Sequence, residues 1–196
     1  MIDAGSVGAA IDAGVNGDTE AIVQQVADAI GRADFGSLAQ GPAAPAPGPG
    51  QGGGNSGTPS DSARVETVVN RALSQLGVPY AWGGGNANGP TRGIRDGGVA
   101  DRHGDYNKIG FDCSGLMIYA FAGIGKALPH YTGYQYTSGP QYPIANRKRG
   151  DMLFWPGHVA LYLGDGLMVE APQSGDVVKI SPVRLAGAMP MVVRLV

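Results

Sequence analysis

A stretch rich in glycine and proline, residues 41–60, divides this chain of 196 residues into two unequal parts. It reads GPAAPAPGPGQGGGNSGTPS and contains neither a charged side chain nor a periodic apolar pattern. Such a segment cannot bury enough apolar surface to offset the entropy that ordering it would cost. The sequence therefore predicts an N-terminal helical segment over residues 1–40, a linker over residues 41–61 and a folded domain over residues 62–196.

The N-terminal segment contains one clear helical pattern, over residues 18–38, where apolar side chains recur three and four positions apart. About 40 residues with few large side chains cannot build a core of their own. We expect the segment to serve one of two purposes. Either it lies over or beside the functional cleft as an inhibitory segment, or it is a spacer that joins the domain to a partner outside this chain.

The charge and hydropathy of the chain exclude several classes of partner. The formal net charge is −2, and the largest basic run is Arg147-Lys148-Arg149, so nucleic acid is not an expected partner. The chain has no run of about 18 apolar residues, so no membrane span is predicted. The first ten residues also lack the basic start and the apolar core of a secretory signal.

The pattern in the second part of the chain predicts an α+β domain. Residues 62–76 place apolar side chains on one helical face, with Ser62 near the start and a glycine at position 77 that suits a helix end. Residues 113–124 are expected to form a second, largely buried helix. Short β-type runs then follow between turn residues, at 151–154, 158–163, 167–171, 177–180 and 191–196. Helices followed by an antiparallel meander are typical of this fold class.

The chain contains a single cysteine, Cys113, so no intramolecular disulfide is possible. The residue is either a buried, inert thiol or a reactive one. Asp112 is well placed to cap the helix, which puts Cys113 in the first turn. There the unpaired backbone amides are predicted to lower the thiol pKa below its usual value of about 8.5. The adjacent Asp112 carboxylate opposes this effect.

A thiolate nucleophile needs a base, and the chain has three histidines. His103 lies in a polar, glycine-rich segment and is expected at the surface. His130 follows a proline and suits the wall of a pocket or a packed position. His158 begins a predicted strand, which makes it the best candidate for a base.

The turn after this strand decides whether Glu170 assists His158. A loop of two residues places Glu170 on the far face of the hairpin, away from His158. A loop of three residues, 164–166, with Gly166 in the left-handed region, places Glu170 opposite Ala160 and diagonal to His158 on the same face. We predict the second arrangement, in which Glu170 accepts an imidazole N–H. The alternative is an ordinary solvated carboxylate on a strand.

Six motifs in order along the chain resemble those of the NlpC/P60 family, and most of all its mycobacterial Rip-type cell-wall hydrolases. They are GVPYAWGGG at 77–85, GFDCSGL at 110–116, LPHYTGYQY at 128–136, RGDMLFW at 149–155, HVALYLGDG at 158–166 and MVEAP at 168–172. The resemblance covers residues 62–196 and does not reach the first 60 residues.

The resemblance implies a papain-like α+β fold in which the cysteine-bearing helix packs on an antiparallel sheet. It implies a secreted, cell-wall cysteine endopeptidase that cleaves the peptidoglycan stem peptide between D-glutamate and diaminopimelate through a thioester. By motif, Cys113 is the nucleophile, His158 is the base and later the acid, and Glu170 orients the imidazole. Many members of the family have a histidine at this third position, and the glutamate fits the Rip-type subset.

The resemblance also implies a set of residues that contact the substrate. Tyr80 matches a tyrosine that lines the site and helps to stabilise the oxyanion, with the Cys113 backbone N–H as a second donor. Asp112 and Ser114 match residues that contact the charged termini of the substrate, and we expect His130 beside them. The protein is expected to be a monomer, and other cell-wall hydrolases are the expected protein partners.

Two readings compete with an active endopeptidase. The first is a catalytically weak or silent protein on the same fold that binds peptidoglycan or acts as a scaffold. The second uses the same chemistry on another amide, as an amidase or an acyltransferase. The intact cysteine, histidine and acid argue against the silent protein, and the sequence discriminates poorly against the second.

Two segments depart from the Rip-type pattern. Residues 93–110 form a longer segment, so a polar loop is expected near the nucleophile. The link Pro156-Gly157 is shorter than in the relatives. Both border the expected cleft, so an altered substrate selectivity is predicted.

The longer segment also carries four residues of metal-binding type, but their spacing is not diagnostic, and neither a metal nor a cofactor is predicted. These residues are Asp96, Asp101, His103 and Asp105.

Overall fold

The computed structural model describes residues 60–196. The N-terminal segment predicted over residues 1–40 and residues 41–59 of the predicted linker lie outside the described residues. The last two residues of the predicted linker belong to a helix instead, since Ser60 caps it and Asp61 is its first residue. None of the helices in the described part is long and apolar enough to cross a membrane.

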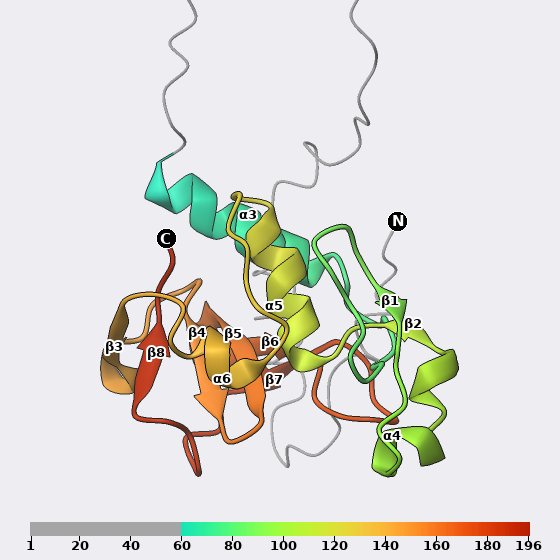
Figure 1. Ribbon diagram of the computed structural model, residues 1–196. Coiled ribbons are helices and arrows are strands. Elements are labelled where there is room, and N and C mark those ends of the chain that lie inside the picture. Colours follow the sequence, from blue (N-terminus) through green and yellow to red (C-terminus); the bar gives the residue numbers. More distant parts are fainter. Residues whose placement is uncertain (1–59) are drawn as a thin grey trace, which may run out of the picture.

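A six-stranded antiparallel sheet forms one layer of the domain, in the order β3-β8-β4-β5-β6-β7 (Figure 1). Neighbouring strands along the chain from β4 to β7 pair directly, as expected for a meander. On the other side of β4, the sheet continues with β8 and ends with β3 as its edge strand. The strands are β3 Gln141–Pro143, β4 Met152–Trp155, β5 His158–Gly164, β6 Leu167–Glu170, β7 Lys179–Pro182 and β8 Met191–Val193.

Two helices, α3 (Asp61–Leu73) and α5 (Cys113–Ala122), lie against each other and cover one face of the sheet (Figure 1). In α3, Val68, Val69, Ala72 and Leu73 are buried on the face predicted from their spacing. The helix begins one residue before the predicted start, because Ser60 caps it by accepting a hydrogen bond from the amide of Ala63. It ends at Leu73, before the predicted end, and the chain then turns through Gly77.

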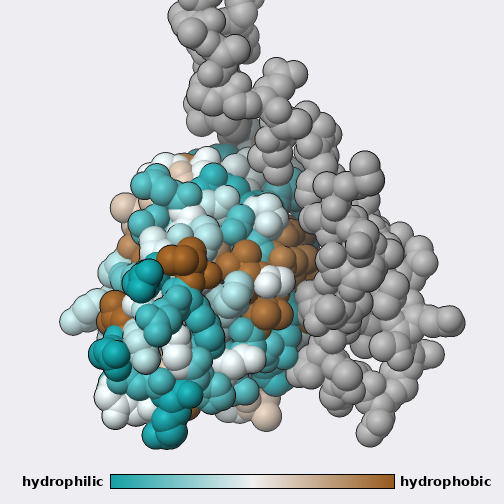
Figure 2. Space-filling view, turned by 90° about the vertical axis from the view of Figure 1, so that its right-hand side faces the viewer, coloured by the Kyte–Doolittle hydropathy of each residue, from teal (hydrophilic) through white to brown (hydrophobic). Residues whose placement is uncertain are grey.

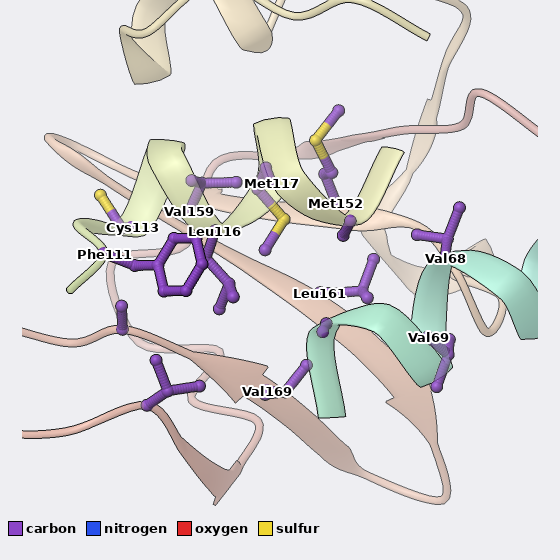
Figure 3. Packing of buried hydrophobic residues seen from close by; sticks show 14 of the residues in the cluster. Val68, Val69, Phe111, Cys113, Leu116, Met117, Met152, Val159, Leu161 and Val169 are labelled. Carbon is purple, nitrogen blue, oxygen red and sulfur yellow. The ribbon is translucent and has the colours of Figure 1, made fainter. Parts of the chain in front are cut away.

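The main core lies between these helices and the sheet (Figure 3). Leu116 and Met117 of α5 have no exposed surface and meet Val159 and Leu161 of β5 in one cluster. The opposite face of the sheet carries a smaller cluster, formed by Leu153, Ala160, Tyr162, Met168 and Val192. The strict alternation between the two clusters along β5 explains why this strand is apolar almost throughout.

Several short elements were not predicted. Residues 91–110 form the small strands β1 (Thr91–Arg92) and β2 (Ile109–Gly110), with α4 (Val99–Arg102) and the 3-10 turn η2 (Asp105–Asn107) between them. A second group surrounds the chain before β4, with α6 (Thr132–Gln135) and the 3-10 turn η3 (Ile144–Asn146) beside β3. Elements this short carry too few residues for a periodic pattern.

The turn between β5 and β6 has two residues at its tip, so the predicted three-residue loop is wrong. Gly164 pairs with Leu167, and the residues between them both have positive φ, 50° at Asp165 and 76° at Gly166. A tight type I′ turn needs these values, and glycine adopts them without strain. The register then shifts by one residue, as in a β-bulge, between Tyr162 and Gly164.

The register in the body of this hairpin is nevertheless the predicted one. Leu161 pairs with Val169 beyond the bulge, and the same register continued puts Glu170 opposite Ala160. The bulge shifts the register by one residue, as the third residue of the predicted loop would have done. Glu170 therefore lies on the same face of the sheet as His158.

The packing of α5 on the sheet predicts that Leu116→Ala lowers the free energy of unfolding by about 2–5 kcal/mol, since it leaves a cavity in the main core. Denaturant unfolding measures this change. Leu185→Ala, the same truncation at a side chain that is 56% exposed, is the matched control and should cost about 0.5 kcal/mol or less. Equal losses in the two variants would contradict the described core.

Candidate active site

Cys113 is the first residue of α5, and its helix starts where the sequence predicts. Asp112 caps the helix by accepting a hydrogen bond of 2.7 Å from the amide of Gly115. Gly115 is required at this point, because a Cβ there would lie 2.0 Å from the carbonyl oxygen of Gly84. This close approach presses the start of α5 against the loop that follows Tyr80.

The carboxylate of Asp112 is held from four directions. Its Oδ1 also accepts from the Ser114 hydroxyl at 3.0 Å and lies 2.9 Å from His130 Nε2, and its Oδ2 accepts from the amide of Gly83 at 3.0 Å. The hydrogen bond to Asp112 raises the pKa of His130 above its usual 6.5. Asp112, Ser114 and His130, which the motifs grouped as substrate contacts, therefore form one hydrogen-bonded cluster beside Cys113.

Cys113 is buried, with 8% of its surface exposed, and its environment does not favour a thiolate. Burial first, and then the Asp112 carboxylate, raises the pKa of Cys113 to about 12. Backbone amides, including its own and that of Ser114, act in the opposite direction but are outweighed. The predicted lowering of this pKa is wrong, because helix-start amides cannot offset both burial and an adjacent negative charge. The resting residue is a neutral thiol, so it needs a base.

The base candidate and the acid candidate are brought together as predicted. His158 starts β5 and Glu170 ends β6, and His158 Nε2 lies 2.6 Å from Glu170 Oε2. Because an ionised carboxylate only accepts, Nε2 carries the proton of this bond, and Nδ1 is left as the free nitrogen of a neutral ring. Cys113 Sγ lies 3.9 Å from the carbonyl oxygen of Gly157, the residue that precedes His158.

A residue that sequence reasoning missed, Arg184, completes this arrangement. Its guanidinium donates to both oxygens of Glu170, at 2.8 and 2.7 Å. Glu170 has no exposed surface. Burial alone would raise its pKa, but the hydrogen bonds from Arg184 and His158 outweigh burial and lower the pKa of Glu170 to about 2. Arg184 follows β7, and the Trp155 indole N–H donates to its backbone carbonyl.

Tyr80 and the longer segment line a cleft of about 380 Å³. Burial raises the pKa of the Tyr80 phenol most, and the nearby Asp112 carboxylate adds to this effect, so the hydroxyl stays protonated. The α4 part of the segment forms the facing wall, with Val99 and His103. His103 is exposed, as predicted.

The short link Pro156-Gly157 forms a two-residue turn in which Trp155 pairs with His158. A second hollow of about 130 Å³ adjoins this turn, and Tyr131 and Met189 contribute to its lining. Residues 93–110 and the link Pro156-Gly157 therefore border two separate hollows.

The acidic residues of the longer segment have structural partners. Asp96 accepts from the amides of Gly98, Ala100 and Asp101 at the start of α4. Asp105, which has no exposed surface, pairs with Lys108 Nζ at 2.8 Å. Within residues 60–196 no group of three or more histidine, cysteine or acidic side chains is placed to hold a metal ion.

Comparison with known proteins identifies the fold that carries this site. The family model of NlpC/P60 matches residues 77–195, which include every candidate residue described above. The chain belongs to the NlpC/P60 family.

Several similar relatives are mycobacterial proteins. Peptidoglycan endopeptidase RipA of Mycolicibacterium smegmatis is 52% identical over 136 residues, which is 67% of this chain but only 26% of RipA. Peptidoglycan endopeptidase RipB of Mycobacterium tuberculosis is 44% identical over 207 aligned positions, covering 96% of this chain and 82% of RipB. The solved structure of RipB superposes with a TM-score of 0.64 at 40% identity, over 98% of this chain and 97% of that chain.

A third relative differs in its described role. RipD of Mycobacterium tuberculosis is described as a non-catalytic NlpC/P60 domain protein adapted to peptidoglycan binding. Its structure superposes with a TM-score of 0.60 at 42% identity, over 68% of this chain and 98% of that chain. Similarity at this level therefore fixes the NlpC/P60 fold but not the activity, which depends on the side chains of the site.

The Asp112 cluster of this NlpC/P60 domain generates a prediction about His130. A proton NMR titration should give a His130 pKa above 6.5, and Asp112→Asn should return it towards that value, because the amide keeps a hydrogen-bond acceptor but loses the charge. The raised pKa contributes stability that is fully present below pH 6.5 and is lost as the pH rises through the folded-state value. An unchanged His130 pKa in the variant would refute this account.

The Glu170–Arg184 pair generates a second prediction. Arg184→Met should lower the free energy of unfolding at pH 7 by about 1–3 kcal/mol, since it leaves a buried carboxylate with one partner fewer. The lowered pKa of Glu170 contributes stability that is present above its usual pKa of 4.5 and is lost as the pH falls towards 2. The difference between variant and wild type should therefore shrink over that range in denaturant unfolding.

The matched control is Arg95→Met, since Arg95 is 66% exposed and forms a longer ion pair, of 3.6 Å, with Asp101. Exposed pairs contribute little, so this variant should differ from wild type by less than about 1 kcal/mol at any pH. A constant difference for Arg184→Met between pH 7 and pH 3 would show that its effect does not depend on the charge of Glu170.

Proposed function

We propose that this protein is a secreted cysteine endopeptidase of the bacterial cell wall that hydrolyses the peptide stem of peptidoglycan. One observation carries the proposal, the 2.6 Å hydrogen bond between His158 and Glu170 on the strands beside Cys113. It supplies an oriented base next to the only cysteine of the chain. The names of RipA and RipB, which describe peptidoglycan endopeptidases, support the choice of substrate.

In the proposed mechanism, His158 Nδ1 removes the proton from the Cys113 thiol as the substrate binds. The thiolate attacks the amide carbon, and the ring, now doubly protonated, is stabilised by the ionised Glu170. His158 then protonates the leaving amine, which produces a thioester. Water, activated by the same histidine, hydrolyses the thioester and restores the thiol.

Charge that develops on the carbonyl oxygen needs donors that are already in place. The backbone N–H of Cys113, in the first turn of α5, and the Tyr80 hydroxyl are the two proposed donors. The raised pKa of Tyr80 supports this role, because the phenol keeps its proton in the neutral range.

We further propose that the bond cleaved joins D-glutamate to diaminopimelate. The cluster of Asp112, Ser114 and His130 is the proposed contact for a charged end of the stem peptide, since it holds a carboxylate and an ionisable ring next to the nucleophile. The protein is expected to act as a monomer in the cell wall, together with other cell-wall hydrolases.

The second candidate function is the binding of peptidoglycan without its hydrolysis. The similarity to RipD, which is described as such a protein, favours this candidate. The side chains argue for the enzyme, because a binding protein has no need of a buried ionised glutamate held against a histidine at the end of a strand.

Incubation with purified peptidoglycan, read by mass spectrometry of the released muropeptides, tests the proposal. Wild type should release products cut between D-glutamate and diaminopimelate. Cys113→Ala and His158→Ala should lower the rate by roughly 10³-fold or more, and Glu170→Gln by roughly 10²-fold or more, since each removes part of one catalytic unit.

Unfolding curves of the variants provide the control for folding, and co-sedimentation with the cell wall measures binding. Equal products from wild type and Cys113→Ala would end the proposal. Wall binding with no turnover by wild type would favour the binding protein instead.

A further inference from the structure

The cleft beside Tyr80 is separate from the thiol and from the Asp112 cluster. The strand that ends in Glu170 continues directly into one of its walls, residues 172–174, and α4 forms another. Tyr80 and Trp82 come from the loop that packs against the start of α5. The cleft thus opens next to the proposed catalytic residues, but most of its lining has no role in the mechanism above.

The walls of the cleft are joined by one buried side chain, Asp105. Its Oδ2 accepts from the Ser174 hydroxyl at 2.6 Å and lies 3.3 Å from the amide of Trp82, and its Oδ1 pairs with Lys108 at 2.8 Å. The three segments that line the cleft therefore meet at this carboxylate. In addition, Trp82 accepts a backbone hydrogen bond of 2.8 Å from Ile94. The cleft is held in shape before any ligand binds, as ligand sites commonly are.

The lining points to the class of ligand. Trp82 is 44% exposed and offers a flat aromatic face with weak negative charge, which attracts the C–H groups of a sugar ring. The polar groups are the side chains of Tyr80, Asp96, His103, Gln173 and Ser174, which suit hydroxyl and acetamido groups. No lysine or arginine is among the described residues that line the cleft, so a carboxylate of the stem peptide would find no ammonium or guanidinium group to pair with there.

The surroundings of the cleft are consistent with contact to a larger polymer. Figure 2 shows the side of the molecule that carries β1, β2 and α4, where hydrophobic side chains gather in a band across a largely hydrophilic surface. Exposed apolar side chains of this segment are Ile94, Val99 and Ile109, each more than half exposed. A volume of about 380 Å³ lies within the usual range of small-ligand sites.

We infer that this cleft binds a neutral, N-acetylated sugar ring of the glycan strand to which the stem peptide is attached. This inference rests on the proposed function and adds a site to it. The protein then prefers stem peptides that still carry their sugar over free stem peptides. The segment 93–110, which supplies one wall, sets this preference.

Two substrates with the same stem peptide isolate the sugar. One carries the disaccharide, and the other carries an acetyl group on its amino terminus, so that neither has a terminal ammonium. Wild type should cleave the disaccharide-linked peptide with a kcat/KM about three- to tenfold higher, which is the size of one aromatic contact. Trp82→Ala should bring this ratio close to one while kcat/KM for the acetylated peptide stays near that of wild type.

A second variant tests the same cleft in case Trp82→Ala fails to fold. Val99→Arg fills the cleft from a side chain that is 54% exposed, and it should also abolish the ratio. Tyr134→Ala, which removes a 66% exposed aromatic side chain outside the cleft, is the matched control and should leave the ratio unchanged. Unfolding temperatures report whether each variant folds.

A wild-type ratio near one, or a ratio that survives both Trp82→Ala and Val99→Arg, would overturn the inference. A third substrate, the same stem peptide with a free amino terminus, covers the opposite case. If it were preferred and the preference were lost in Asp96→Asn, the cleft would bind an ammonium group instead of a sugar.

Failure of the proposed function gives a different result, because wild type would then cleave neither substrate. In that case calorimetric binding of the disaccharide-linked and acetylated peptides still tests the cleft. Tighter binding of the disaccharide-linked peptide that is lost in Trp82→Ala would support the cleft alone, and equal binding would overturn it.

Discussion

A carboxylate with no access to solvent, that of Glu170, is the constraint on which the candidate site depends. Burying a charge costs several kcal/mol unless partners replace the lost water. The partners come from different parts of the chain, His158 from β5 and Arg184 from the loop after β7, while Lys179 stands opposite in the register and pairs with Asp176. The charge therefore requires three strands and one loop to be in place together, and the same contacts orient the imidazole.

A second carboxylate, that of Asp112, makes the thiol of Cys113 harder to deprotonate. It caps α5 and so places Cys113, but its charge and the burial of the thiol raise the Cys113 pKa. A protonated thiol reacts slowly with oxidants and with other thiols, since the thiolate is the reactive form. The single cysteine of this chain is thereby protected at rest. In the proposed mechanism its reactivity depends on the base His158, which Glu170 orients.

The sequence predicted those parts of the site that lie in continuous patterns. The helix start at Cys113 and the face shared by His158 and Glu170 followed from a cap and from alternation along a strand. The turn itself was predicted wrongly, because glycine at Gly164 and Gly166 is compatible both with a longer loop and with a tight turn next to a bulge. Arg184 was missed, because its contact with Glu170 joins residues 14 positions apart and no local pattern marks it. Asp105 was assigned no partner, because its contact with Ser174 joins residues 69 positions apart.

The two segments predicted to differ from the Rip-type pattern border separate hollows. The tight turn at Gly157, where φ is 76°, brings its carbonyl oxygen to 3.9 Å from Cys113 Sγ, so a substituent larger than glycine would strain the backbone beside this thiol. The longer segment instead builds a wall of the cleft beside Tyr80, and Asp105 holds that wall in place. In the proposed mechanism, changes in the first segment therefore alter the geometry at the nucleophile. Changes in the second segment alter which substrate is held while the proposed catalytic residues keep their positions.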